Sequence, residues 1–170
     1  MISRRTVLLG PIAFGVAPAV ARAAAQPTQL RGLEAALALE HEAVHAVPSV
    51  GARLDDATKE LAREIDAHHR VQRDRVSDAL RAAGRTPPAA LPSYAVRVPV
   101  VDRDTAVSAL VLLEESLMRA YAEAVETEPA SLRRLAAELL ARCGTHATSL
   151  HIAWRRTLAG STDAFPSRGH

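Results

Sequence analysis

Four segments of the chain carry apolar residues at the three- and four-residue spacing of an amphipathic helix, and no segment shows a sustained strand-like alternation. Aspartate is a favoured helix N-cap, proline suits a first helical turn and glycine commonly ends a helix. A residue preceding proline avoids the helical conformation, so the first helix should stop before Pro48. The sequence therefore predicts an all-α domain with helices at about 29–46, from Asp55 or Asp56 to Gly84, from Asp102–Asp104 to about Thr127, and from about Pro129 to Gly160.

The links between these helices differ greatly in length. Short turns join the first helix to the second and the third to the fourth, which favours two antiparallel hairpins. The link 85–101 is rich in proline, and at roughly 3.1 Å per residue it reaches on the order of 50 Å, more than the ~40 Å of a helix of about 26 residues. Five apolar residues are expected to pack it on a helix instead of leaving it a disordered linker: Leu91, Tyr94, Val96, Val98 and Val100. We therefore predict a ferritin-like four-helix bundle, two antiparallel helical hairpins joined by a long crossover.

Charged and imidazole side chains occupy the apolar seams of these predicted helices. Glu40 lies among leucines and valines of the first helix, Glu114 lies among those of the third, and His146 lies between Leu139 and Trp154 of the fourth. Counting from the hairpin turns places His146 within a turn of Glu114. The same count places Ile65 and His68 nearest to Glu40, with His69 a little further on. Because His68 and His69 straddle the apolar face, one of them should point inward.

A buried carboxylate must be protonated, hydrogen-bonded, ion-paired or bound to metal. One interpretation is a structural network in which Glu114 accepts from His146, and Glu40 accepts from His68 or His69. The second is a metal site formed by Glu40, Glu114, His146 and His68 or His69. A third is a rotated helix that exposes some of these side chains. Carboxylates and imidazoles inside a four-helix bundle suit one transition metal ion, namely iron, manganese or zinc.

Other candidate ligands are less favoured by the helical geometry. Glu42 and His45 spell E-x-x-H, but Glu42 faces away from the core, and His41 and His45 lie at the bundle edge. Cys143 is the only cysteine, so it cannot close an internal disulfide. It is interpreted as a small buried hydrophobe, with metal ligand or intermolecular thiol as alternatives.

The N-terminus resembles a twin-arginine export signal. Arg4 and Arg5 follow a serine, a weakly apolar stretch broken by glycine and proline comes next, and Arg22 precedes an expected cleavage after Ala23. We therefore assign residues 1–23 to a signal peptide and 24–170 to one ferritin-like domain, exported with the twin-arginine machinery to the periplasm, cell envelope or medium. The apolar stretch is too short and interrupted for a membrane anchor.

Removal of residues 1–23 takes away three arginines and no acid, which leaves 18 basic against 19 acidic side chains. The basic character of the whole chain therefore belongs to the leader, and nucleic-acid binding is not expected. A homo-oligomer remains open.

Six stretches of the sequence resemble a family of twin-arginine-exported, ferritin-like domain proteins of unknown function. They are Leu33–His41, His69-Arg70 with Arg73-Asp74, Pro99-Val100 with Asp102, Leu113-Glu114-Glu115, Ala153-Trp154-Arg155 and Ala164-Phe165-Pro166. The resemblance implies a ferritin-like bundle, and the family has no established reaction.

The di-iron pattern of ferritin-like proteins is incomplete in this chain. That pattern needs a glutamate from each of two helices and Glu-x-x-His from each of the other two. Glu40 and Glu114 match the single glutamates, but Asp66 precedes His69 and Cys143 precedes His146 at the remaining positions. The sequence thus favours one metal ion in a site with fewer ligands than the di-iron pattern. It does not determine whether the protein is an enzyme. The alternative is a metal-free helical binding or structural module of the cell envelope.

Overall fold

The computed structural model describes residues 31–95 and 98–162, with side chains up to residue 155. The predicted signal peptide, Val96 and the Ala164–Pro166 motif lie outside the described residues. Within them the chain forms four long helices and one short 3-10 turn. These are α1 (Gly32–Val50), the turn η1 (Gly51–Arg53), α2 (Asp56–Ala82), α3 (Arg103–Thr127) and α4 (Ala130–Thr162). The all-α prediction is confirmed.

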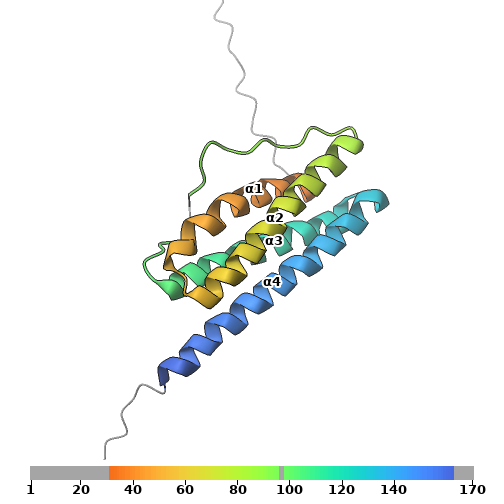
Figure 1. Cartoon of the computed structure of the whole chain (residues 1–170). Coiled ribbons are helices and arrows are strands. Elements are labelled where there is room, and N and C mark those ends of the chain that lie inside the picture. The colour runs from red at the N-terminus through yellow and green to blue at the C-terminus, as the bar shows by residue number, and fades with distance from the viewer. Residues whose placement is uncertain (1–30, 96–97, 163–170) are drawn as a thin grey trace, which may run out of the picture.

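The helices pack as two antiparallel hairpins joined by a crossover along the length of the bundle (Figure 1). The first hairpin is α1 with α2, and the second is α3 with α4. In addition α1 lies against α3, and α2 lies more loosely against α4. The crossover brings the chain from the end of α2 back to the opposite end of the bundle, so α2 and α3 run parallel. The predicted ferritin-like connection is therefore confirmed. In the part of the chain that the structure describes, no helix is long and apolar enough to cross a membrane.

Aspartates begin the two central helices as the sequence predicts. The Asp55 side chain accepts a hydrogen bond from the Thr58 backbone N–H at 2.8 Å, which caps α2. Asp102 and Thr105 form a reciprocal capping box at the start of α3. These side chains satisfy backbone donors that have no partner within their own helix. Local sequence therefore fixes where these two helices start.

Two predicted helix ends are wrong. Pro48 lies inside α1, which continues to Val50 before the 3-10 turn. Pro48 itself is exposed, whereas Val47 and Val50 are buried in the core, so their burial maintains the last turn despite one missing backbone hydrogen bond. The fourth helix continues past Gly160 to Thr162. A glycine costs a helix only about 1 kcal/mol and does not end it alone.

The crossover lies along α1, in agreement with the predicted packing of most of its apolar residues. The His45 and Tyr94 rings lie 5.6 Å apart, and the His41 ring nitrogen Nε2 is 3.2 Å from the Pro88 carbonyl oxygen. Val100 packs against the core cluster. Leu91 is an exception, because 62% of it is exposed where packing was predicted. His41 and His45 thus occupy the bundle edge and hold the crossover.

A carboxylate fastens the end of the bundle where α1 begins and α3 ends. Glu128 Oε1 accepts the backbone N–H of Leu33 at 3.0 Å, and Glu128 Oε2 accepts from Arg85 Nη1 at 2.6 Å. Arg85 also pairs with Glu34, so the start of the crossover joins the same group. Gly32 has φ +53°, and a Cβ placed there would lie 2.6 Å from Glu128 Oε1. Only glycine fits this close approach in the left-handed region without strain.

We expect Gly32→Ala to lower the free energy of unfolding by about 1–3 kcal/mol, because it adds left-handed strain and displaces Glu128. Urea denaturation measures the change. The matched control is Gly51→Ala, whose φ is −56° and whose added Cβ would meet no atom within 4 Å. It should stay within about 1 kcal/mol of the parent or stabilise slightly. Equal effects of the two substitutions would contradict the proposed role of Gly32 in the close approach to Glu128.

Candidate functional site

A cluster of titratable side chains occupies the centre of the bundle. It contains Glu40 of α1, His69 of α2, Glu114 of α3 and His146 of α4, and each lies near the middle of its helix. Glu40 and His69 are fully buried, Glu114 is 1% exposed and His146 is 4% exposed. Because these residues project from long helices in a packed core, their positions are well defined.

His69 bridges the two glutamates. Its Nδ1 lies 2.8 Å from Glu40 Oε2, and its Nε2 lies 3.0 Å from Glu114 Oε1. A carboxylate only accepts hydrogen bonds, so both ring nitrogens donate and the ring is an imidazolium. One charged histidine thereby links α1, α2 and α3.

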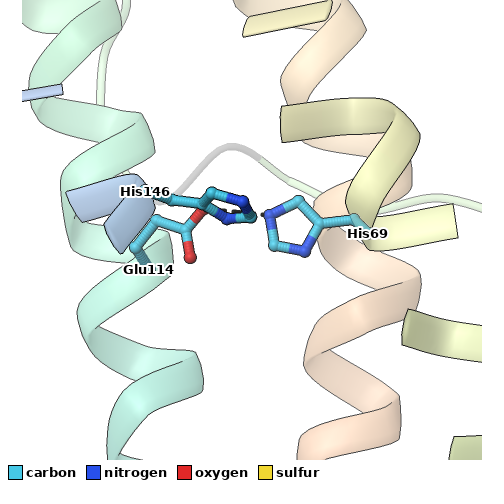
Figure 2. A group of neighbouring side chains, drawn as sticks. All are labelled: His69, Glu114 and His146. Atoms are coloured by element: carbon cyan, nitrogen blue, oxygen red, sulfur yellow. Dashed lines mark hydrogen bonds and ion pairs between the residues drawn. The ribbon is translucent and has the colours of Figure 1, made fainter. Parts of the chain in front are cut away.

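His146 reaches the same glutamate oxygen from α4 (Figure 2). Its Nδ1 lies 3.1 Å from Glu114 Oε1, and its Nε2 lies 3.0 Å from Nδ1 of His68. Since Nδ1 donates to the carboxylate, Nε2 is the ring nitrogen of His146 that faces His68. A continuous hydrogen-bonded chain therefore runs from half-buried His68 to the core.

The opposite side of the cluster ends at Tyr121 of α3. Its hydroxyl donates to Glu40 Oε1 at 2.6 Å, so both oxygens of Glu40 are hydrogen-bonded. Burial first, and then the charge of Glu40, raise the pKa of Tyr121 well above its ordinary value. The phenol therefore remains a proton donor at neutral pH.

The charges of the cluster support one another. Burial by itself would lower the pKa of His69, but the hydrogen bonds and charges of Glu114 and Glu40 outweigh burial and raise it to about 10. For Glu114, burial raises the pKa, and the hydrogen bonds from His146 and His69 more than reverse this, so the pKa falls below its ordinary value. Glu114 is thus ionised and His69 protonated at neutral pH.

Three donor atoms in this cluster are placed to share a cation. One carboxylate oxygen of Glu114, a ring nitrogen of His69 and a ring nitrogen of His146 all lie within 4.8 Å of one another. Glu114 Oε2 is buried and has no hydrogen-bond partner among the described residues. A carboxylate with two imidazoles is a donor set for zinc, iron or manganese. Glu40 lies on the other edge of the His69 ring and is not part of this group.

Four of the predicted site residues meet in the core, and His69 takes the place next to Glu40 for which the count from the turn favoured His68. Glu40, Glu114, His69 and His146 meet in the core, and His146 contacts Glu114 within the turn that the hairpin count allowed. His69, and not the nearer-counted His68, reaches Glu40. His68 is half-buried and contacts only His146 of this set. The count from the turn does not include the relative rotation of packed helices, which decides between adjacent residues.

The two positions that depart from the di-iron pattern do not join the donor group. Asp66 is half-buried and pairs with Arg70 of the same helix, outside the donor group. Cys143 is buried, and its Sγ donates a weak hydrogen bond to Gln72 Oε1 at 3.9 Å. Burial, then Glu114 and Glu40, raise the pKa of the Cys143 thiol far above its ordinary value. The thiol is therefore protonated and unreactive in this environment.

Two polar core residues of this layer were not predicted to have a role at the site. Tyr121 was interpreted as plain core, and Gln72 as one of the residues that define the apolar face of α2. Tyr121 follows Glu114 by seven residues, which places it two turns along on the same face, so its hydroxyl could have been assigned to the glutamates. A glutamine on an apolar seam is itself a signal of a buried polar layer.

The fold and the site together define a ferritin-like four-helix bundle with a buried glutamate and histidine cluster. Residues 32–169 match the model of a family described as Domain of unknown function (DUF4439), and the chain belongs to that family. Its structure is similar to the crystal structure of a conserved hypothetical protein, rv2844, from Mycobacterium tuberculosis. The TM-score is 0.68 at 27% identity, covering 81% of this chain and 92% of that one. No curated protein matches the sequence significantly.

The raised pKa of His69 predicts a pH dependence of stability in the metal-free protein. The pKa is about 10 in the folded state against 6.5 for an ordinary histidine. The bound proton therefore stabilises the folded state fully below pH 6.5, and this contribution is lost as the pH rises from 6.5 towards 10. In that window the free energy of unfolding should fall by up to about 1.4 kcal/mol per pH unit from this one proton.

Urea denaturation at several pH values, with a chelator present, measures this slope. His69→Gln should be less stable at neutral pH and should lose the slope, because glutamine does not titrate. His151→Ala removes an exposed histidine of α4 and should retain the slope. Equal slopes in the parent and His69→Gln would show that His69 is not the protonated bridge.

Proposed function

We propose that this protein is an exported ferritin-like domain protein that binds one transition metal ion in its core. The ligands are His69 Nε2, Glu114 Oε1 and His146 Nδ1. The observation that carries this proposal is the mutual proximity of these three buried donor atoms from three different helices. A three-residue donor set leaves coordination positions for water or a substrate.

Two properties of the metal-free network support this assignment, namely an oxygen without a hydrogen-bond partner and a net negative charge. Glu114 Oε2 is buried without a hydrogen-bond partner among the described residues, and a buried unpaired oxygen is costly. With both glutamates ionised and His69 protonated, the three side chains together carry one net negative charge. Exchange of the His69 proton for a divalent cation makes the group neutral, which reduces the cost of burying charge.

Glu40 and Tyr121 would hold the ligand His69 without touching the ion. Glu40 accepts from His69 Nδ1, which leaves Nε2 as the free ligand atom, and Tyr121 fixes Glu40. Carboxylates commonly orient metal-binding histidines in this way and increase their basicity. The bound ion would supply Lewis-acid or redox chemistry according to its identity, and the donor set suits iron, manganese or zinc.

The competing proposal is a metal-free helical module of the cell envelope. It is favoured by one specific observation, namely that protonated His69 already pairs with both glutamates. In that case the cluster fixes the relative positions of the helices, as buried polar groups do in some bundles. The two proposals differ in whether a proton or a metal ion occupies the space beside Glu114.

Metal content distinguishes these proposals. The protein exported by its native host should contain near-stoichiometric iron, manganese or zinc by elemental mass spectrometry, and Glu114→Gln should lose it. The adjacent Glu115→Gln, which alters a half-buried residue outside the cluster, is the control and should retain the metal. Native protein that is folded but free of metal would favour the envelope module.

The position of Glu40 predicts a graded result. Glu40→Gln removes a charge that orients His69 but no ligand atom, so metal affinity should fall by about 10–100-fold without being abolished. Competition with a chromophoric chelator measures the affinity. Complete loss of binding, as in Glu114→Gln, would instead make Glu40 a direct ligand.

The export proposal rests on Arg4 and Arg5, outside the described residues. A double Arg4→Lys/Arg5→Lys variant preserves charge but removes the twin-arginine signal, so the chain should remain in the cytoplasm. Arg22→Lys is the control and should be exported. Immunoblots of cell fractions measure the outcome, and normal export of the double variant would contradict this route.

A further inference from the structure

Two imidazoles face each other across the seam between α2 and α4. Nδ1 of His68 lies 3.0 Å from Nε2 of His146, and the rings are nearly parallel, with an interplanar angle of 6°. His146 directs its other nitrogen to Glu114 Oε1 at 3.1 Å. The ring of His146 therefore has one edge toward His68 and the other toward the three-ligand group.

Exposure decreases along this row of atoms. His68 is half-buried, His146 is almost fully buried, and Glu114 and His69 are enclosed. His68 Nδ1 lies 3.0 Å from His146 Nε2, and His146 Nδ1 lies 3.1 Å from Glu114 Oε1, so a single imidazole ring separates the outer nitrogen from the inner donors. A cation that leaves water would meet ring nitrogens at the outer edge of His146 and again at its inner edge, which lowers the cost of its desolvation at both places.

The seam that contains the pair is the loosest side of the bundle. Helices α2 and α4 pack against each other less closely than the other neighbouring pairs do. A hollow of about 360 Å³ opens in this seam, lined by Thr58 and Leu61 of α2 and by Ser149 and Ile152 of α4. Ser149 lies one helical turn from His146, so the hollow opens one turn from the pair on the same seam, although neither histidine lines it.

We propose that His68 and His146 form an outer capture site for a divalent transition metal ion, which then passes across the His146 ring to the inner donors. This inference rests on the metal-binding function proposed above and adds its entry route. His68 acts during loading and is not a ligand of the final site. Two neutral imidazole nitrogens are suitable first ligands for such an ion.

The test follows uptake of Co²⁺ by exported protein whose metal has been removed with a chelator. Stopped-flow visible absorption records the rate, and the final spectrum records the inner ligands. His68→Ala should slow uptake at least about tenfold while the final stoichiometry and spectrum stay those of the parent. His151→Ala removes an exposed histidine of the same helix as His146 and should load at the parent rate.

The outcomes separate this inference from the function on which it rests. A parent rate in His68→Ala would overturn the entry route but leave the inner site intact. A changed final spectrum in His68→Ala would make His68 a permanent ligand and would also overturn the capture role. Absence of Co²⁺ binding to the parent protein would overturn the inner site itself, and the entry route with it.

A second measurement isolates the outer pair. In a Glu114→Gln background the inner site is lost, and one weakly bound Co²⁺ should remain at His68 and His146. Adding His68→Ala in that background should remove the bound Co²⁺. Adding His68→Gln, whose side chain is of similar length but has no imidazole, should remove it as well. Circular dichroism confirms that each variant is folded. Equal Co²⁺ binding with and without His68 would overturn the capture site.

Discussion

The bridge from His69 to Glu40 and Glu114 is the interaction on which the centre of this bundle depends. Two carboxylates from α1 and α3 are fully desolvated, and each would be costly without a partner. One imidazolium from α2 pairs with both at 2.8 and 3.0 Å. Loss of the histidine would leave two buried charges of the same sign facing each other, so the bridge holds three helices together in one layer.

The rest of the structure supports this layer from both sides. Tyr121 donates a hydrogen bond to the second oxygen of Glu40, and His146 connects α4 to Glu114. At one end of the bundle, Glu128 connects the start of α1 with Arg85 at the start of the crossover. At the other end, Asp55 and Asp102 cap α2 and α3. These contacts fix the level of each helix, and so they keep donor atoms of different helices about 3 Å apart.

The same geometry serves a proton or a metal ion. Oxygen and nitrogen atoms at 3.0–3.1 Å are hydrogen-bonded when a proton lies between them, and they are also spaced as neighbouring ligands of one small cation. Glu114 Oε2, which has no hydrogen-bond partner in the described part of the chain, and the net negative charge are the observations that support the proposed cation. Membership of a family described as a domain of unknown function assigns no chemistry to the chain, so the metal proposal rests on these atoms.

Helical periodicity, N-cap aspartates and the long proline-rich link were sufficient to predict the four helices and the ferritin-like connection. They were sufficient because apolar spacing and caps act within a few residues of the chain. Glutamates and histidines on apolar seams likewise indicated the core cluster. Packing alone decided that His69 and not His68 bridges the glutamates, that Tyr121 completes the network, and that α1 continues through Pro48. These features depend on the rotation and burial of one helix against another, which the sequence of a single helix does not contain.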